Sequence, residues 1–378
     1  MKKKIVIGFT LILLLSLGIF VYTNVPIRTS IFRSMVKGDS YIITDSDTIY
    51  SFGHYGIKKW LRKDSNTVEL LSENGDFCHN TLVGWLIGRG GIIHGRYLYV
   101  TCRSYLGGAD KSNTPDYVAG KLLVVDKYNL RVLNQFDCNI KLVEAKITGN
   151  SLIVSGLCGF DIYDISTPVS PKLKYRYRSD KFTEFQGFST FESDSCCYIA
   201  FSKFTEGISI WEMTQPERTH HVIDISIQDT LVTKQVLPKD LQCCDVELKY
   251  PYLYASLSSV GKSFNTENDR KGVFVCDISN LSDIKSNVAL IPKNFWQKRR
   301  CGDPMPTFID IYKNNVYVNL ADRGIAVFDI SNPLYPSFKK TMSIKESMLD
   351  YIYPIHIDNN GLLYSGCQYF SKIHITKL

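Results

Sequence analysis

Residues Gly159–Pro168 read GFDIYDISTP, and nearly the same string returns twice further along the chain. Gly324–Pro333 read GIAVFDISNP, and Gly272–Asn280 read GVFVCDISN. A unit repeated within one chain indicates an array of a single supersecondary element. The repeat therefore predicts the architecture. It says less about function, because one scaffold can serve binders and enzymes alike.

Each unit reads as four short strands joined by turns. In the sixth unit, Val316–Val318 is a short apolar run, and Ile325–Ile330 carries β-branched residues at near-alternate positions, as a half-buried strand does. Thr307–Tyr312 and Ser337–Met342 supply the strands on either side. The Asp-Ile-Ser segment predicts a turn, because Asp and Ser side chains accept hydrogen bonds from nearby backbone N–H groups and a following Pro ends the pairing of a strand. Turn formation is the predicted role of the repeated aspartates, which are Asp164, Asp277 and Asp329.

Weaker copies of the unit fill most of the remaining chain. The first runs from about Tyr41 to Leu71, and the last, Tyr351–Leu378, is one strand short. About seven units of roughly 40–50 residues predict an all-β fold, a β-propeller with four-stranded blades. Pro26–Met35 is the candidate for a strand that closes the ring. Six or eight blades are the alternatives, because the first two units are degenerate; a β-sandwich is disfavoured, because two-sheet folds do not produce tandem repeats.

The repeated string resembles the LVIVD-repeat family of β-propeller proteins, which are found mostly in bacterial envelopes. The matching residues are Gly159–Pro168, Gly272–Asn280 and Gly324–Pro333, with Gly207–Pro216 a looser match. The resemblance covers roughly Tyr97–Leu378 and implies a surface or periplasmic propeller of mostly unassigned function. It carries no catalytic motif, because the residues that the family shares are turn and core positions.

The amino terminus predicts export with a retained anchor. Lys2–Lys4 precede the uncharged apolar run Ile5–Tyr22, which would reach about 27 Å as a helix, close to the hydrocarbon thickness of about 30 Å. No small-x-small cleavage site follows the run. We therefore expect an anchor or transmembrane helix in 1–25, a linker or ring-closing strand in 26–40 and the propeller in 41–378, outside the cytoplasm. Basic residues also follow the run, which weakens the positive-inside asymmetry; they are Arg28, Arg33 and Lys37.

Charge and cysteine content limit the classes of partner. The net charge of +7 includes Lys2–Lys4, and Lys298–Arg300 is the one dense basic cluster elsewhere, so we expect no nucleic-acid partner. The 11 cysteines form no CxxC pair. Some would pair in an oxidising compartment, for example Cys78 with Cys102, whereas many unpaired cysteines would favour a reducing setting.

The innermost strands supply the candidate functional residues. Alignment of the units on their apolar runs places five residues at equivalent positions, where they could converge in the central channel: Lys146, Glu192, Glu247, Asp310 and His356. Glu247, Asp310 and His356 are the catalytic candidates, as acid and base on a sugar or ester, and the carboxylates could hold a cation. Lys146 and Glu192 are binding candidates. The alternative is that strands beside a water-filled channel simply carry polar residues.

Other candidates lie outside the channel. Trp85, Tyr105 and Trp296 could stack on a sugar ring or a peptide, and the loops that would carry such contacts are 107–119 and 292–306. His220–His221 has no third ligand that the sequence can place, so a metal site there is disfavoured. Gly88–Gly91 lacks the strand-to-helix context of a phosphate loop. No cofactor is predicted.

These observations predict a membrane-tethered extracytoplasmic propeller that serves as a binding scaffold for a protein or glycan partner. A hydrolase or lyase that uses the channel carboxylates is the first alternative, and a purely structural envelope component is the second.

Overall fold

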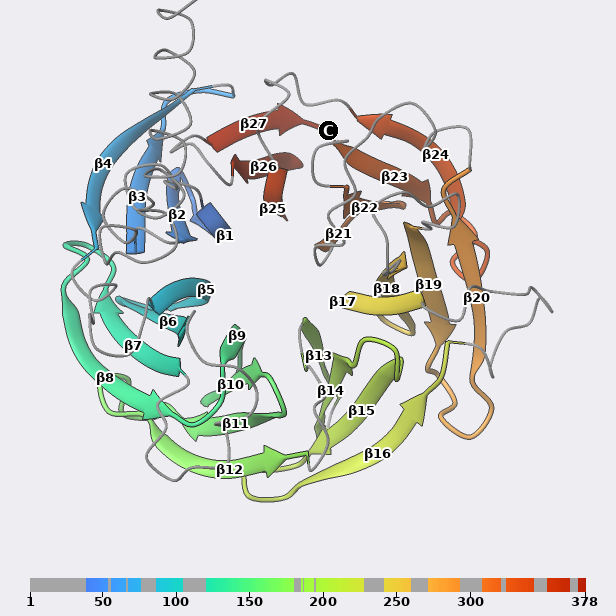
Figure 1. Cartoon of the computed structure of the whole chain (residues 1–378), viewed down its shortest axis with the longest axis horizontal. Coiled ribbons are helices and arrows are strands. Elements are labelled where there is room, and N and C mark those ends of the chain that lie inside the picture. Colours follow the sequence, from blue (N-terminus) through green and yellow to red (C-terminus); the bar gives the residue numbers. More distant parts are fainter. Residues whose placement is uncertain are drawn as a thin grey trace, which may run out of the picture.

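The protein is described here by a computed structural model. The described residues are 39–53, 56–65, 67–75, 86–104, 120–179, 185, 187–193, 195–227, 241–259, 271–292, 308–320, 324–342, 352–367 and 373–378. Within them, the chain forms seven antiparallel sheets that are arranged as blades around one axis (Figure 1).

Every blade is a meander that begins at the ring axis and proceeds outward. Blades 1 to 3 consist of β1 (Asp39–Asp45), β2 (Thr48–Gly53), β3 (Gly56–Arg62), β4 (Val68–Asn74); β5 (Leu86–His94), β6 (Tyr97–Ser104), β7 (Gly120–Asp126), β8 (Val132–Cys138); and β9 (Leu142–Thr148), β10 (Ser151–Gly156), β11 (Gly159–Asp164), β12 (Lys172–Arg178). Blades 4 and 5 consist of β13 (Phe188–Glu192), β14 (Cys197–Ser202), β15 (Ile208–Met213), β16 (Thr219–Ile225); and β17 (Leu241–Lys249), β18 (Tyr252–Ser259), β19 (Lys271–Asp277), β20 (Lys285–Leu290). Blades 6 and 7 consist of β21 (Ile309–Tyr312), β22 (Asn315–Asn319), β23 (Ile325–Asp329), β24 (Ser337–Met342); and β25 (Ile352–Ile357), β26 (Leu362–Cys367), β27 (Ile373–Lys377).

The all-β, seven-bladed prediction is confirmed, and the alternatives of six or eight blades are wrong. In the described part of the chain the last blade has three strands, as its truncated repeat predicts. The ring-closing strand expected at Pro26–Met35 lies outside the described residues and stays a prediction. The anchor expected in 1–25 lies outside them too, and the described residues include no helix long and apolar enough to span a membrane.

The repeated glycine lies at the start of the third strand, where the backbone of the outermost strand passes close to it. A Cβ on Gly159 would lie 2.0 Å from the carbonyl oxygen of Tyr177, and one on Gly207 would lie 2.1 Å from that of Ile225. The φ angles, 155° at Gly159 and 90° at Gly207, also fall where L side chains are rare. The repeat therefore requires glycine for both backbone conformation and close approach.

The repeated Asp forms the turn that the sequence predicts. Asp164 Oδ1 accepts a hydrogen bond from the backbone N–H of Ser166 at 2.8 Å. The same bond recurs at Asp277 and Asp329, with lengths of 2.9 and 2.8 Å. Each turn directs the isoleucine after its Asp into the core, and these residues are Ile165, Ile278 and Ile330. The predicted structural role of the three aspartates is confirmed.

Tyrosines of the second strands join neighbouring blades at these turns. Tyr99 of blade 2 donates to the carbonyl oxygen of Pro168 in blade 3 at 2.9 Å, and Tyr254 of blade 5 donates to that of Pro333 in blade 6 at 3.4 Å. The repeated Asp-Ile-Ser-x-Pro segment is thus both a turn and an acceptor for the preceding blade.

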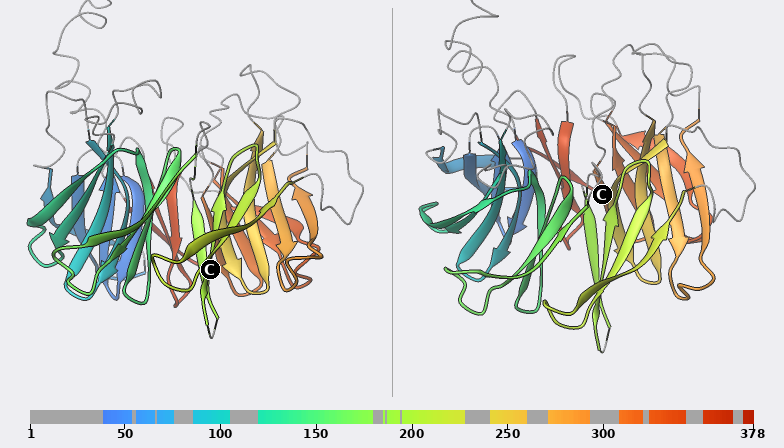
Figure 2. Two further views of the ribbon diagram at one scale, coloured as in Figure 1. Left: turned by 90° about the horizontal axis from the view of Figure 1, so that it is seen from below. Right: turned by 60° about the horizontal axis from the view of Figure 1, so that its bottom comes forward.

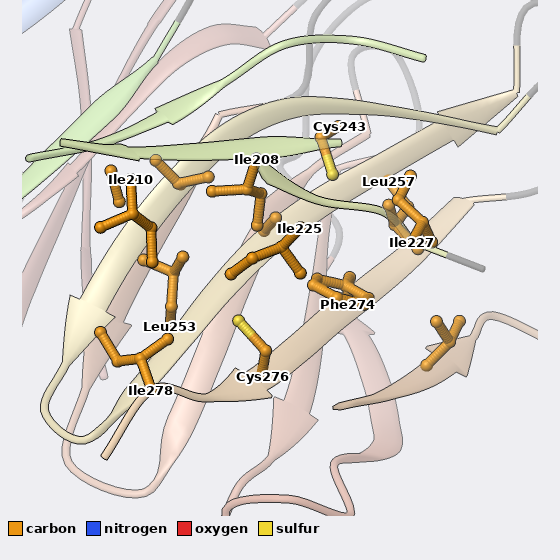
Figure 3. Packing of buried hydrophobic residues seen from close by; sticks show 14 of the residues in the cluster. Ile208, Ile210, Ile225, Ile227, Cys243, Leu253, Leu257, Phe274, Cys276 and Ile278 are labelled. Carbon is orange, nitrogen blue, oxygen red and sulfur yellow. The ribbon is translucent and has the colours of Figure 1, made fainter. Parts of the chain in front are cut away.

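Apolar clusters between adjacent blades form the core. Between blades 4 and 5, Ile208 and Ile210 pack with Leu253 and Cys276 (Figure 3). The first and last blades pack in the same way and close the ring; this cluster contains Ile42, Ile49, Trp60, Leu362, Tyr364, Ile373 and Ile375.

The turns that join first to second and third to fourth strands all lie on one side of the ring, which we call the turn face (Figure 2). It includes Ser46–Asp47, Gly149–Asn150, Tyr250–Pro251 and the Asp-Ile-Ser turns. Because β1 runs toward Ser46–Asp47, its first residue, Asp39, lies at the opposite face.

We expect Gly159→Ala to lower the free energy of unfolding by about 3 kcal/mol or more. The added methyl group would clash with a backbone carbonyl oxygen, which cannot move without distorting the sheet. Gly149→Ala is the matched control: its φ of 51° is also left-handed, but nothing lies within 4 Å of the added Cβ, so about 1 kcal/mol is expected. Urea denaturation of both variants measures the difference, and equal costs would contradict the close-approach account.

Candidate functional site at the ring axis

The strand pairing confirms most of the alignment that the sequence predicts. In blades 3, 5 and 6, the third residue after the repeat glycine pairs with a residue of the second strand. That second-strand residue pairs in turn with an innermost-strand residue, which is Lys146, Glu247 or Asp310. His356 occupies a corresponding position on β25, opposite Tyr364. These residues therefore share one level of the ring.

Glu192 does not belong to that level, and its alignment with the others is wrong. Ser189 holds the equivalent position on β13, whereas Glu192 lies at the end of the strand and accepts a hydrogen bond from Thr148 at 2.6 Å. The turn 193–196 is longer than the turn Tyr250–Pro251, so equal spacing along the sequence does not give equal register.

Carboxylates of the inner strands hold the next blade in place. Asp310 Oδ2 accepts the backbone N–H of Ile357 at 2.7 Å. Glu144 Oε2 accepts that of Phe188 at 3.0 Å. An innermost strand is a sheet edge with unpaired backbone groups, and a buried unpaired N–H is costly. The polar residues thus satisfy the edge of the neighbouring blade.

The same bond recurs between blades 4 and 6. Ser189 Oγ accepts the backbone N–H of Leu248 at 3.2 Å, and Asp245 Oδ2 accepts that of Ile309 at 3.1 Å. Four successive interfaces, from blade 3 to blade 7, therefore carry an equivalent contact that we call an axial cap.

Lys146 is the cation of this region. Its Nζ lies 3.2 Å from Glu247 Oε2 on blade 5 and 3.7 Å from Glu144 Oε1 on its own strand. Because blade 4 presents only Ser189 at this level, the lysine bonds to a blade two positions away. Burial lowers the pKa of Lys146, but Glu247 and Glu144 outweigh burial and raise the pKa above its ordinary value.

Burial and mutual repulsion raise the pKa of three carboxyl groups, those of Glu144, Asp245 and Asp310. Burial, followed by the charge of Glu247, raises the pKa of Asp310 to about 7. Burial, followed by the charge of Glu144, raises the pKa of Asp245. Tyr41 joins the group, because its hydroxyl donates to Glu144 Oε1 at 3.4 Å and burial raises its pKa. We call Tyr41, Glu144, Lys146, Asp245, Glu247 and Asp310 the axial cluster.

His356 stands apart from the axial cluster and joins the two ends of the ring. Its Nε2 lies 3.0 Å from Thr44 Oγ1 on β1. Burial lowers the pKa of His356 to about 4, so the ring is neutral near pH 7. Among the described residues, the side-chain hydrogen bond of His356 joins it to Thr44 and not to Glu247 or Asp310.

The axial cluster holds its polar groups in internal bonds. Asp310 has a pKa suited to acid–base chemistry, but its two oxygens accept the backbone N–H groups of Ile311 and Ile357. Glu247 is paired with Lys146, whose ammonium group stands where a bound cation would interact with the carboxylates. Among the described residues, no three His, Cys, Asp or Glu side chains are placed to hold a metal ion. The predicted channel cation stays a prediction.

Sequence reasoning missed Glu144, Asp245, Ser189 and Tyr41. The signal for two of them was present: Glu144 and Lys146, like Asp245 and Glu247, are two residues apart and thus lie on one side of a strand. Nothing in the sequence indicates which backbone N–H of another blade each side chain reaches.

The structure describes only some of the other residues that the sequence predicts as candidates. Outside the described residues lie Trp85, Tyr105, Trp296, the loop 107–119 and, apart from Pro292, the loop 292–306. His220 and His221 lie on β16, where His221 Nε2 is 3.1 Å from Asp224 Oδ1 and faces solvent. Gly88–Gly91 forms part of β5, and a Cβ on Gly91 would lie 2.6 Å from the Phe52 ring, which explains a glycine there without a ligand.

Free thiols are mostly core residues. The cysteines in question are Cys138, Cys158, Cys196, Cys197, Cys243 and Cys276. Burial raises the pKa of Cys138 and of Cys197 to about 11, which suppresses the reactive thiolate. Cys102 is buried in the core between blades 1 and 2, and its suggested partner Cys78 lies outside the described residues.

Comparison with known proteins supports the fold and not a family. No family model matches the chain, and no curated protein matches it. Among solved structures, the Neurospora crassa Pan2 WD40 domain is similar, with a TM-score of 0.54, 10% identity and coverage of 90% of this chain and 91% of that chain. The WD40 propeller domain of Doa1 has a TM-score of 0.51, 11% identity and coverage of 90% and 93%. U3-55K has a TM-score of 0.54, 9% identity and coverage of 91% and 99%. At these identities the likeness shows the fold alone, a β-propeller, in agreement with the seven blades of the structure.

We expect Asp310→Asn to flatten the pH dependence of stability between about pH 4 and pH 7. The folded-state pKa of about 7 exceeds the ordinary value of 3.8, so over this range the folded protein holds a proton that the unfolded chain has lost. Stability therefore falls as pH rises, by at most about 1.4 kcal/mol per pH unit for this group.

Asp329→Asn serves as the control, because the bond to Ser331 lowers the pKa of Asp329 and places its effect below pH 4. Denaturation at several pH values distinguishes the two. Equal slopes in the wild type and Asp310→Asn would contradict a buried, protonated Asp310.

Proposed function

We propose that this chain is a membrane-tethered β-propeller outside the cytoplasm that serves as an interaction scaffold for a protein partner. The axial cluster carries the argument: its charged groups are held in axial caps and ion pairs, which leaves the surface of the ring as the place where a partner can bind. A glycan partner, suggested by Trp85, Tyr105 and Trp296, remains a second expectation for the loops around these residues.

The turn face offers the features that a partner would contact. Its exposed aromatic residues are Tyr128, Tyr250 and Tyr335, with 62%, 51% and 50% of their surface accessible. Tyrosine is enriched among residues that dominate binding energy, because it adds a large contact area with few rotatable bonds. These side chains lie on short turns of a packed ring, so their backbone loses little conformational entropy when a partner binds.

The proposed location rests on the amino-terminal sequence and is compatible with the thiols. Lys2–Lys4 and the apolar run Ile5–Tyr22 support a retained anchor. Buried thiols with raised pKa values, such as Cys138 and Cys197, are protected from oxidation even in an oxidising compartment. Free thiols inside the ring therefore do not argue against export.

The hydrolase or lyase alternative has less support. A general acid or base must reach its substrate, and both oxygens of Asp310 are engaged with backbone donors. The structural alternative is tested directly by the experiment on partners below.

We expect the full chain to fractionate with membranes and to be digested by protease added to spheroplasts, whose cytoplasmic membrane is intact. A variant that lacks residues 1–25 should remain in the soluble cytoplasmic fraction. Protection of the full chain from protease in intact spheroplasts, with digestion only after their lysis, would contradict the proposed location.

A photo-crosslinking amino acid placed at 128, 250 or 335 in the full chain should capture a protein partner in the native host. Positions 70 and 71 are matched controls, since Leu70 and Leu71 are exposed in the middle of the outer strand β4 rather than on the turn face. Mass spectrometry of the adducts identifies the partner. Absence of adducts from all three turn-face positions would favour the purely structural alternative for this face.

A further inference from the structure

The turn after β7 departs from the repeat. Blades 3, 5 and 6 have Asp-Ile-Ser at this place, with the isoleucine buried. Blade 2 keeps the Asp, as Asp126, but Lys127 and Tyr128 replace the other two residues. The tyrosine is 62% exposed, and it is the most exposed of the large hydrophobic side chains in the described part of the chain. A scaffold repeat that is broken by an exposed aromatic residue indicates a use other than packing.

Internal bonds hold this turn in one conformation. Asp126 Oδ1 accepts the backbone N–H of Tyr128 at 2.9 Å, and the N–H of Asp126 donates to the carbonyl of Arg131 at 2.9 Å. Leu130, with a φ of 58°, is fully buried in the core between blades 1 and 2. Its carbonyl accepts the side chain of Asn74 at 2.7 Å. The tyrosine is thus presented by a rigid turn that both blades support.

Three cationic groups from three different segments surround the Tyr128 ring. The Nζ atoms of Lys127 and Lys59 lie 5.5 and 6.0 Å from the ring centroid, and Cζ of Arg96 lies 6.0 Å from it. Asp126 pairs with Arg96 at 2.5 Å, but its side chain is only 2% exposed. The surface that a partner meets is therefore an aromatic ring within a positive rim.

One further anion is near this rim. Asp45 Oδ2 lies 2.7 Å from Lys127 Nζ, and its side chain is 39% exposed. Lys59 Nζ donates to a neutral group, the backbone carbonyl oxygen of Tyr128 at 3.2 Å, whereas Arg96 and Lys127 are paired with carboxylates. The side chain of Lys127 is 14% exposed and paired with Asp45. The accessible positive charge of the rim therefore comes mainly from Arg96, which is 61% exposed, and from the partly exposed Lys59.

We propose that the Tyr128 surface, formed by Lys59, Arg96, Lys127 and Tyr128, docks an acidic segment of a protein partner. An apolar side chain of that segment packs on the ring, while its carboxylates pair with the rim. This inference rests on the proposed scaffold function and names the partner's chemistry.

A protein segment fits this surface better than an anionic membrane. The Tyr128 surface belongs to the turn face, whereas β1 begins at Asp39 on the opposite face. The chain therefore leads from its amino-terminal end into the face that lies away from Tyr128, so a tether there would leave the turn face directed outward.

The test is fluorescence anisotropy with the full chain in detergent and two rhodamine-labelled dodecapeptides. One peptide has Glu and Asp at ten positions and Leu at the central two, and the other has Lys in place of every acid. We expect the acidic peptide to bind at least tenfold more tightly and to weaken as salt is raised. Tyr128→Ala and Lys59→Ala should each weaken binding at least fivefold.

Leu173→Ala is the matched control, because it removes another exposed large side chain that does not belong to the Tyr128 surface, and its affinity should stay within twofold of the wild type. Thermal unfolding confirms that each variant keeps its fold. Equal affinity in Tyr128→Ala, equal affinity for both peptides, or no binding of the acidic peptide would overturn the proposal. Binding to phosphatidylserine vesicles that Tyr128→Ala abolishes, without binding to the peptide, would also overturn it in favour of a membrane surface.

Failure here is distinguishable from failure of the scaffold function. Crosslinked partners at 250 or 335, together with no acidic-peptide binding, would leave the scaffold in place and remove only the Tyr128 proposal. No adducts at any turn-face position and no peptide binding would count against both.

Discussion

The architecture depends on how the innermost edge of each blade is satisfied. Each innermost strand pairs on one side only, so its other side presents backbone N–H groups to the ring axis. A carboxylate or hydroxyl from the preceding blade accepts one of these groups at four successive interfaces, as Asp310 does for Ile357. The polar residues on β9, β13, β17 and β21 that accept these bonds therefore serve assembly before any chemistry.

The repeat and the axial caps act at different radii of the same interface. Near the axis, caps fix the inner strands; further out, the hydroxyls of Tyr99 and Tyr254 reach the proline carbonyls of the next blade. Apolar clusters fill the space between (Figure 3). The first and last blades lack a shared chain connection, and there Arg62 donates to the Tyr364 hydroxyl at 3.0 Å beside the closing core. Each interface thus combines burial with a few directed bonds.

Much of the fold is predictable from the sequence because its determinants are local. Three determinants act within one unit and recur in the sequence of each repeat. They are the glycine beside a carbonyl oxygen, the Asp that accepts the N–H two residues later, and the isoleucine that is buried in the core. The sites are less predictable because they join blades. Ser189 rather than Glu192 shares the level of Lys146, and only the length of the turn 193–196 decides this. The bond between Lys146 and Glu247 joins blades two positions apart, so no local pattern reveals it.

The polar groups at the ring axis are engaged in holding the blades together. The sequence suggests acids, bases and cation ligands at the axis, but in the structure these residues bind neighbouring blades to one another. Departures from the repeat on the turn face are therefore the better indication of a binding surface. Amide hydrogen exchange at Phe188, Leu248, Ile309 and Ile357 tests this most directly. If the axial caps hold the blades, these four amides exchange as slowly as amides paired within the sheets. Exchange at the rate of open strand edges would contradict the account and return the axial carboxylates to the role of free functional groups.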